Sequence, residues 1–428
     1  MKVLMLSWEY PPASVGGLAR HVEELAAALT DMAEVHVLTR GGPSAPGPED
    51  SVLVHRVEPY SLNPADFLGW VFQLNMALLE QGIRLYQHYG PFDILHAHDW
   101  LVAFAARALK HAYLVPLVAT IHATEAGRNQ GLHNDTQRYI SSVEWWLAYE
   151  AWRVIVCSQH MRQEVRRFFQ VPDDKLEVVP NGVRPERFQV RPDLNLRLQY
   201  AAPGEKIIFF VGRLVPEKGV QVLIQAMPAV LRNCPEAKLI VAGQGPMEGE
   251  LKYLAQNLGL GPKVYFTGYL DDARRNALYA VADVAVFPSL YEPFGIVALE
   301  AMAAGTPVVV ADTGGLGEVV THGESGLKAF AGSAASLAEN IFRVLREQGL
   351  ADYLRQEAAR CIASRFNWPR IAQHTYKVYQ RVVGEAGQVD WGRREEDEAG
   401  KRPHQPYSLL EYRRQKQEKG AGTAATRG

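Results

Sequence analysis

The sequence predicts an α/β protein made of two halves, each built around a parallel β-sheet. Short runs rich in β-branched residues and leucine alternate with longer amphipathic stretches from residue 2 to about residue 180, which is the pattern of parallel βαβ units. Residues 184–203 are charged, bounded by prolines and without a strand pattern, so they predict a linker. A second series of the same alternation follows the linker. A chain of 428 residues is long enough for each half to bury its own core.

The first half contains six predicted strands, each a short apolar run bounded by turn or helix signals. They are residues 2–7, 35–39, 52–57, 94–97, 117–122 and 153–158. Residues 62–89 predict a helix with an aromatic face, and the Gly- and Pro-rich residues 40–50 predict a loop. The segment LEVVPNGV, residues 176–183, ends this series.

The second half contains five predicted strands and is followed by one long helix. The strands are residues 206–211, 237–242, 264–267, 284–287 and 307–311. Beyond residue 366 the pattern predicts an amphipathic helix over residues 368–385 and then a charged, disordered tail over residues 386–428. We therefore expect domains over residues 1–183 and 184–367. Parallel sheets bind ligands at the carboxyl ends of their strands, so a cleft between the halves would collect loops from both.

Composition excludes several classes of partner. A net charge of −2 and a pI near 6.7 give no basic surface for nucleic acid or for anionic membranes. Cys157, Cys234 and Cys361 are widely spaced and form no metal or redox motif, which fits a reducing compartment. No stretch reaches the roughly 18 apolar residues that a membrane span requires. We expect a soluble, cytoplasmic protein without integral membrane association; the sequence leaves its oligomeric state open.

The stretch PSLYEPFGIVALEAMAA, residues 288–304, is where we expect the chemistry. It places Glu292 and Glu300 eight residues apart. Eight helical residues rise about 12 Å, whereas the carboxylates of a glycosidase stand about 5 to 9.5 Å apart. The two glutamates are therefore expected to hold different parts of one long ligand. The alternative is a helix N-terminal acid at Glu292 and a solvated Glu300.

A helix N-terminus is predicted in the same stretch, after a Pro- and Gly-rich turn. Its unpaired backbone N–H groups are expected to be those of Phe294, Gly295 and Ile296. Together with the helix dipole, these donors favour a negatively charged group in front of the strand end.

Two further loops carry features that suit a phosphorylated ligand. Gly16 and Gly17 follow the first strand and precede a helix that begins near Leu18, so backbone can approach a ligand closely there. The motif matches neither GxGxxG nor GxxxxGK[ST], which weakens the dehydrogenase and ATPase interpretations; a plain turn is the alternative. In FFVGRLVPEKGV, Arg213 and Lys218 follow a strand end and suit a diphosphate. The alternative is a solvated pair of cations with Glu217 as a partner.

Histidines and an aspartate follow the strand ends of the first half. HAHDW contains His96, His98 and Asp99, and IHATE contains His122. His96 and His98 lie two residues apart and share a strand face, so a metal site is conceivable, but no third ligand has suitable spacing and we expect none. A histidine on a buried strand is more often a satisfied core residue. Asp99 and the adjacent Trp100 suit a sugar, because a carboxylate accepts from hydroxyls and an indole covers an apolar ring face.

The order of these motifs resembles a known family. The chain is similar to retaining glycosyltransferases of the GT-B fold, specifically family four with its glycogen and starch synthase relatives. The motifs that carry the resemblance are, in this order, the glycine pair, HAHDW, IHATE, PNGV, GRLVPEKG, AGQGP and EPFGIVALEAMAAGTPVV. The resemblance covers roughly residues 1–385. It departs from bacterial glycogen synthases at SVGG, where those enzymes usually carry a lysine, so it favours the broad family.

The resemblance implies a role for each candidate residue. Two Rossmann-like domains would face a central cleft, the first binding the acceptor and the second the nucleotide sugar, with the final helix crossing back to the first domain. Glu300 would hold the ribose, and Glu292 would face the donor sugar. Arg213 and Lys218 would neutralise the diphosphate, aided by the backbone of Gly17 and of residues 294–296. His122 would contact sugar hydroxyls or lend its backbone carbonyl to the reacting centre, and Asp99 would help to hold the sugar.

The expected function is transfer of a sugar from a nucleoside-diphosphate donor to a saccharide acceptor. The sugar is expected to be glucose, and the donor ADP-glucose or UDP-glucose. One candidate acceptor is an α-glucan, as in glycogen synthesis. Transfer would proceed with retention, without a metal and without a cofactor. The alternatives are a nucleotide-sugar epimerase of the same architecture and a mannosyl- or glucosyltransferase acting on a lipid or small-molecule acceptor. The donor base and the acceptor stay open.

Overall fold

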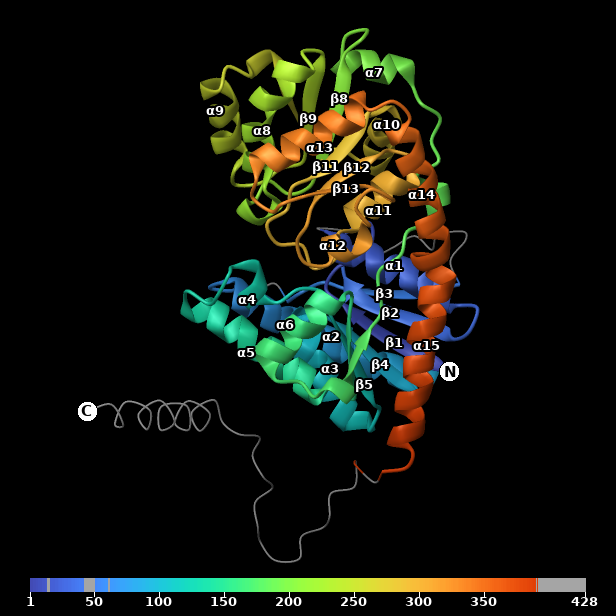
Figure 1. Cartoon of the computed structure of the whole chain (residues 1–428). Coiled ribbons are helices and arrows are strands. Elements are labelled where there is room, and N and C mark those ends of the chain that lie inside the picture. Colours follow the sequence, from blue (N-terminus) through green and yellow to red (C-terminus); the bar gives the residue numbers. More distant parts are fainter. Residues whose placement is uncertain (14–15, 42–50, 61, 390, 392–428) are drawn as a thin grey trace, which may run out of the picture. The chain divides into compact units, whose positions relative to one another are not determined.

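The computed structural model describes residues 1–13, 16–41, 51–60, 62–389 and 391. Residues Met1–Glu385 form one compact unit, and a second unit runs from Ala386 to Gly428. Within the described residues the first unit contains two parallel sheets, ordered β3-β2-β1-β4-β5-β6-β7 and β10-β9-β8-β11-β12-β13 (Figure 1). The predicted α/β class with two Rossmann-like halves is therefore confirmed. Most of the predicted tail and most of the predicted loop at residues 40–50 lie outside the described residues.

The first sheet and its helices form the first lobe. Its strands are β1 (Lys2–Ser7), β2 (Glu34–Arg40), β3 (Leu53–Val57), β4 (Ile94–His98), β5 (Leu117–Ile121), β6 (Arg153–Val156) and β7 (Leu176–Val178). Its helices are α1 (Gly17–Leu29), α2 (Phe67–Tyr89), α3 (Ala103–Tyr113), α4 (Glu125–Arg128), α5 (Asp135–Glu150) and α6 (Gln159–Phe169). Strand β7 was not predicted, because its three residues, LEV, are too short to show a period.

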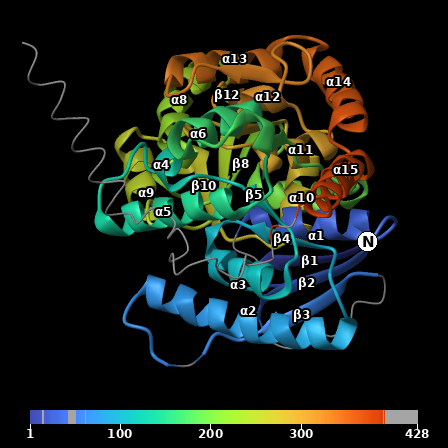
Figure 2. The same cartoon turned by 90° about the horizontal axis from the view of Figure 1, so that it is seen from below.

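Side-chain alternation gives the first sheet two apolar faces. Leu4 and Leu6 of β1 point into a core that α2, α3, α5 and α6 cover. Val3 and Met5 point to the opposite face, which α1 and the last helix, α15 (Trp368–Ala386), cover. Figure 2 shows the sheet between these two layers. The predicted crossing of the final helix to the first lobe is confirmed.

Polar contacts fix α15 on that face. The hydroxyl of Tyr379, fully buried, lies 2.6 Å from Nδ1 of His96 on β4. Nε2 of His96 lies 2.7 Å from Oγ1 of Thr120 on β5. His96 is thus a satisfied core histidine that joins the last helix to the first sheet.

The second sheet and its helices form the second lobe. Its strands are β8 (Lys206–Val211), β9 (Ala237–Ala242), β10 (Val264–Gly268), β11 (Val284–Phe287), β12 (Val308–Ala311) and β13 (Leu327–Ala329). Its helices are α7 (Leu194–Tyr200), α8 (Val220–Asn233), α9 (Glu248–Asn257), α10 (Asp272–Val281), α11 (Ile296–Ala303), α12 (Leu316–Val319), α13 (Ala334–Arg346) and α14 (Leu350–Arg365). The predicted linker, residues 184–203, has no strand, as expected, but contains α7. The proposed boundary after residue 183 stays a prediction.

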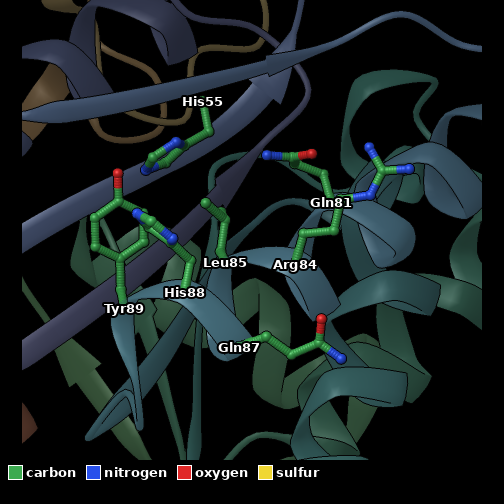
Figure 3. Close-up of a pocket in the computed structure, with 7 residues that line it drawn as sticks. All are labelled: His55, Gln81, Arg84, Leu85, Gln87, His88 and Tyr89. Atoms are coloured by element: carbon green, nitrogen blue, oxygen red, sulfur yellow. The ribbon is translucent and has the colours of Figure 1, made fainter.

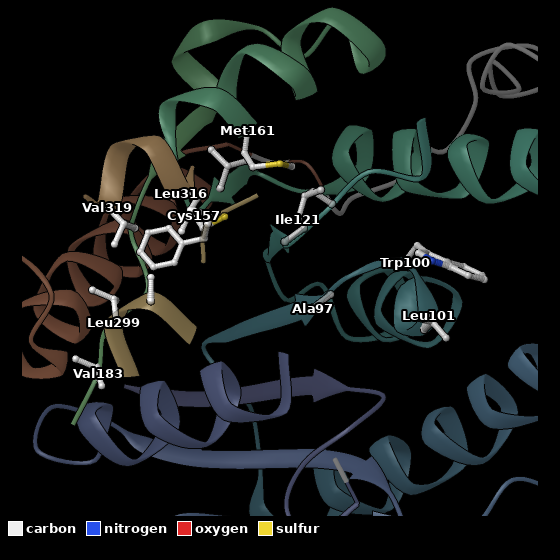
Figure 4. Close-up of a cluster of buried hydrophobic side chains, with 14 of the residues drawn as sticks. Ala97, Trp100, Leu101, Ile121, Cys157, Met161, Val183, Leu299, Leu316 and Val319 are labelled. Carbon is white, nitrogen blue, oxygen red and sulfur yellow. The ribbon is translucent and has the colours of Figure 1, made fainter. Parts of the chain in front are cut away.

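The two lobes share buried contacts. Cys157 and Met161 of the first lobe belong to the same apolar cluster as Leu316 and Val319 of the second (Figure 4). Polar bonds surround this cluster: Oγ of Ser158 donates to the Pro293 carbonyl at 2.8 Å. In the described part of the chain, no helix combines the length and apolar character needed to cross a membrane.

Candidate active site

The predicted site residues gather where the strand order of each sheet reverses. The chain leaves the centre of the first sheet after β1 and returns beside it at β4, and it does the same at β8 and β11 of the second sheet. Such switch points open a crevice at the carboxyl ends of the strands. The loops after β1 and β4 carry the glycine pair and Asp99, and those after β8 and β11 carry Lys218 and Glu292.

Lys218 and Glu292 form the best-defined contact of the second-lobe loops. Nζ of Lys218 lies 2.7 Å from Oε2 of Glu292, and Oγ of Ser289 donates to the same oxygen at 3.1 Å. Glu292 is 8% exposed, whereas Lys218 is half-buried. Arg213 is exposed and pairs with Glu217 at 3.3 Å. The structure therefore holds Lys218 in place and leaves Arg213 in an exposed surface pair, which contributes little stability.

Gly219 makes this geometry possible. Its φ of +68° is a left-handed conformation, and a Cβ added there would lie 2.0 Å from the carbonyl oxygen of Pro288. The loop after β8 therefore passes directly over the end of β11. This close approach brings Lys218 to Glu292, although 74 residues separate them in the chain.

Helix α11 begins after the Pro- and Gly-rich turn, as predicted. Its first residue is Ile296, and Gly295, with φ of +102°, precedes it as N-cap. Phe294 and Gly295 therefore belong to the turn, and the unpaired first-turn N–H groups start at Ile296. The predicted role of the N–H groups of Phe294, Gly295 and Ile296 in binding a ligand stays a prediction.

The glycine pair of the first lobe faces the start of α11. A Cβ added to Gly17 would lie 3.2 Å from Cδ1 of Ile296. The N–H of Gly16 donates to Oε2 of Glu9 at 3.2 Å, which fixes the loop after β1. Backbone from one lobe thus meets a helix N-terminus from the other.

Glu300 lies inside α11 and is 5% exposed. Nε of Arg275 lies 3.7 Å from its Oε2. Burial raises the pKa of Glu300, and the positive charges of Arg275 and of Arg20, from α1, oppose that rise. Glu300 is thus a buried and loosely paired carboxylate near the start of α1. The alternative interpretation, a solvated Glu300, does not agree with this burial.

Asp99 and His122 are joined at the end of the first sheet. The backbone N–H of His122 donates to Oδ1 of Asp99 at 2.8 Å. Asp99 adopts φ +62° and ψ +173°, a conformation that is essentially restricted to glycine. Part of its surface reaches solvent, yet burial raises its pKa to about 7, against the opposing effect of the bond from His122. Backbone strain of this kind is concentrated at functional sites.

A cluster of histidines lies behind this pair. Nδ1 of His98 lies 3.2 Å from Nε2 of His122, and His21 of α1 packs against both rings. Nδ1 of His21 lies 2.7 Å from Oδ1 of Asn181. Burial lowers the pKa of all three histidines, that of His122 to about 3. We define His21, His98 and His122 as the histidine triplet.

The sequence analysis did not include His21 or Asn181 among the candidates. Asn181 belongs to the PNGV motif, but nothing in that motif indicates that its side chain reaches back to α1. His21 lies four residues after Gly17 in an ordinary amphipathic helix. Only the folded structure brings the side chain of His21 next to Asn181, His98 and His122.

A polar hollow lies elsewhere on the first lobe. It is lined by the C-terminal part of α2 and by β3 (Figure 3), through His55, Gln81, Arg84, Leu85, Gln87, His88 and Tyr89. The Tyr89 carbonyl accepts from Nζ of Lys2, the first residue of β1. The hollow is therefore near the amino ends of the strands, and it contains none of the predicted site residues.

Two families match the chain, one for each lobe. The family described as Glycosyltransferase Family 4 matches residues 15–187, and that described as glycosyl transferases group 1 matches residues 195–360. An uncharacterized glycosyltransferase of Methanocaldococcus jannaschii is 40% identical over an alignment of 389 positions, which covers 89% of this chain and 98% of that relative. A glycogen synthase of Mycobacterium tuberculosis is 36% identical over 397 residues, 89% of this chain and 94% of that relative.

The fold also matches a solved structure. Sucrose-phosphate synthase from Thermosynechococcus elongatus superposes with a TM-score of 0.77 at 27% identity, and the match covers 90% of this chain and 99% of that one. Both lobes are included in this match, so the correspondence extends to the arrangement of two parallel sheets around the loops described above.

Proposed function

Because the chain belongs to the family 4 glycosyltransferases of the GT-B fold, we propose that it transfers a hexosyl group, with retention, from a nucleoside-diphosphate sugar to a saccharide acceptor. Glucose is the proposed sugar and an α-glucan the proposed acceptor. The similarity to a glycogen synthase over 94% of that enzyme supports this choice. Reaction in the cytoplasm belongs to the same proposal.

The observation that carries the proposal is the contact between Lys218 and Glu292 at the switch point of the second sheet. A lysine held at 2.7 Å by a buried carboxylate has a fixed position before any ligand arrives. Arg213 lies five residues earlier on the same loop and is exposed, so its guanidinium is available to a phosphate. Positive charge placed where a diphosphate leaves stabilises the transition state more than the ground state.

The nucleotide side of the donor is assigned to the start of α11 and the glycine pair. The helix N-terminus at Ile296 favours phosphate oxygens, and Gly17, which has no side chain of its own to cover its backbone, lies next to the side chain of Ile296. Glu300 would accept hydrogen bonds from the ribose hydroxyls. A buried carboxylate with one cation at 3.7 Å keeps acceptor capacity for such hydroxyls.

The sugar side is assigned to Glu292, Asp99 and His122. Oδ1 of Asp99 accepts a hydrogen bond from the His122 backbone N–H at 2.8 Å. Asp99 would therefore position His122 and also offer its own oxygens to the sugar. Glu292 would keep one oxygen on Lys218 and present the other to the sugar. His122 would contact the sugar hydroxyls with its ring or offer its carbonyl to the anomeric centre.

Retention follows if the leaving phosphate oxygen takes the proton of the attacking hydroxyl on the same face of the sugar. The bond from C1 to the phosphate breaks, the bond from C1 to the acceptor oxygen forms, and the proton passes to the departing diphosphate. No protein general base is needed for this route, so the chain contributes positioning and charge stabilisation. We propose that the reaction requires no metal and no cofactor.

A panel of nucleotide sugars offered to the purified protein tests the proposal. A thermal shift identifies the donor, and product analysis with glucan, monosaccharide and lipid acceptors identifies the transfer. We expect release of nucleoside diphosphate that depends on a saccharide acceptor, and an α-linked product from an α-linked donor. An altered sugar still attached to the nucleotide would support the epimerase instead, and a β-linked product would exclude retention.

A further inference from the structure

The histidine triplet has the composition of a transition-metal site. Its members come from three elements: His21 from α1, His98 from the end of β4 and His122 from the residue after β5. One ring nitrogen of each lies within 4.8 Å of the other two. Three imidazoles without a carboxylate suit Zn²⁺ and neighbouring metals such as Co²⁺, Ni²⁺ and Cu²⁺.

Nε2 of His21, a residue that is 3% exposed, is a buried ring nitrogen without a hydrogen-bond partner among the described residues. Nε2 of His98 also lacks a partner there, but the nitrogen of that ring that faces His122 is Nδ1, so the open ligand position is that of His21. A buried polar atom without a partner costs roughly 1–3 kcal/mol, and such an atom in a native fold calls for an explanation such as an ion. His96, the neighbouring histidine on β4, provides the contrast: both of its nitrogens are bonded, to Tyr379 and Thr120.

The spacing and the supporting contacts fit a metal site. Nδ1 of His98 and Nε2 of His122 are 3.2 Å apart, and two nitrogens bound to a tetrahedral Zn²⁺ at about 2.0–2.1 Å lie about 3.3 Å apart. Nδ1 of His21 faces the Asn181 oxygen at 2.7 Å, which fixes its tautomer and presents Nε2 as the ligating atom. His122 is partly exposed, so an ion can reach the triplet from solvent.

From this geometry we infer that the histidine triplet binds one transition-metal ion of the Zn²⁺ class through one nitrogen of each ring, and that this ion excludes the donor sugar from His122. The ion binds to the two facing nitrogens, Nδ1 of His98 and Nε2 of His122, and replaces the proton that they share. This proton is released to solvent. Three protein ligands leave a fourth position open to water. The exclusion of the sugar, unlike the metal site itself, rests on the proposed function.

Titration of the metal-stripped, full-length protein with Co²⁺ tests the site directly. We expect one equivalent to bind with the visible d–d absorption of a four-coordinate nitrogen site, and Zn²⁺ to displace it. His21→Gln and His98→Gln should each weaken the affinity by at least about tenfold, and Asn181→Ala, which leaves all three ligands in place, by about 10- to 100-fold. His133→Gln is the matched control, because His133 is exposed on the same lobe and outside the triplet.

The outcomes are distinct. Absence of Co²⁺ binding, or binding that is unchanged in His21→Gln, His98→Gln and Asn181→Ala, overturns the metal site. Circular dichroism and thermal melting of each variant show which of them fold, and Asn181→Ala decides the matter if a histidine variant does not. Loss of absorption in these variants but not in His133→Gln supports the site.

A second titration separates this inference from the proposed function. Addition of the nucleotide sugar that the donor panel identifies should reduce the Co²⁺ absorption and raise the apparent Kd for the metal. If that donor binds and the absorption is unchanged, exclusion of the sugar is wrong. If no nucleotide sugar binds, the proposed function fails while the Co²⁺ result with the three variants still decides the metal site.

Discussion

Two buried lysine–glutamate contacts in this molecule differ in what surrounds them. The structural pair joins Lys110 of α3 to Glu150 of α5 at 2.9 Å, and Arg107 and His111 add bonds to the same carboxylate. The site pair joins Lys218 to Glu292 at 2.7 Å, with Ser289 as a further donor. One carboxylate is thus surrounded by three basic side chains, and the other contacts a single cation in a loop at a strand end.

The difference shows how a buried ion pair that supports the fold can be told from one prepared for a ligand. Burial alone would raise the pKa of Glu150, but the bonds from Lys110, Arg107 and His111 outweigh it and lower the pKa to about 2. Its oxygens are committed within the first lobe, between two helices. The site pair lies beside an exposed arginine at the switch point of the second sheet, where an incoming anion meets positive charge.

Lys218→Ala should have the largest effect. We expect kcat to fall by about 10²- to 10³-fold, as for loss of one donor to a developing negative charge, and Arg213→Ala to lower kcat by about 10²-fold or more. Steady-state kinetics with the identified donor measure both. Lys252→Ala, an exposed lysine of α9, is the control and should leave kcat unchanged. An unchanged kcat in both Lys218→Ala and Arg213→Ala would show that the Lys218–Glu292 pair supports the fold, like the Lys110–Glu150 pair, and takes no part in catalysis.

Glu150→Gln should change stability and its pH dependence, without changing turnover per folded molecule. The pKa of Glu150 is lowered on folding from 4.5 to about 2, so its carboxylate contributes stability above pH 4.5, and this contribution is lost as the pH falls toward 2. The stability advantage of the wild type over Glu150→Gln should shrink by about 2 kcal/mol between pH 5 and pH 3. Urea unfolding followed by circular dichroism measures it. A constant difference across this range would contradict the assignment.

Glu300 extends the comparison to a third buried carboxylate, with the loosest pairing of the three. Glu300→Ala should raise the donor KM by about tenfold or more with a smaller change in kcat, because ribose contacts exist before and during the reaction and hydrogen bonds to charged groups contribute about 1.5–3 kcal/mol. Glu300→Gln keeps an acceptor and should fall between the wild type and Glu300→Ala. A loss confined to kcat would argue against the ribose contact.

Ser289→Ala should give the smallest effect. It removes the 3.1 Å bond to Glu292 and leaves Lys218 in place. A net contribution of about 0.5–1.5 kcal/mol corresponds to a loss of about 2- to 10-fold in kcat/KM. Ser364→Ala, an exposed serine of α14, is the control. A loss as large as that of Lys218→Ala would show that the hydroxyl, rather than the cation, dominates this site.

Much of the fold could be predicted from the sequence because parallel strands are buried on both faces and appear as short apolar runs. Strands β1, β8, β9 and β11 begin and end at the predicted residues. The three-residue strands β7 and β13 were missed, since so few residues show no period. The exact start of α11 at Ile296 was not predicted, because the left-handed conformation of Gly295 cannot be distinguished in sequence from an ordinary turn.

The candidate site was predictable in its loops and less so in its contacts. Residues directly after central strands were found because the carboxyl ends of parallel strands meet at one edge. The pairing of Lys218 with Glu292 was not expected, since it depends on the close approach of Gly219 to Pro288. The third histidine of the triplet was also missed, because sequence spacing cannot show that the ring of His21 on α1 meets the residues that end β4 and follow β5.

The position of α15 on the first sheet has a consequence for biosynthesis. A ribosome makes residues 1–183 first, yet one apolar face of their sheet is covered in part by residues 368–386, which include the Tyr379 that bonds to His96. A nascent chain that has just emerged with its first lobe therefore leaves the part of that face around His96 uncovered until translation has passed the last helix. The lobe that is synthesised first is the one that finishes folding last, and the intervening interval is when a chaperone would be needed.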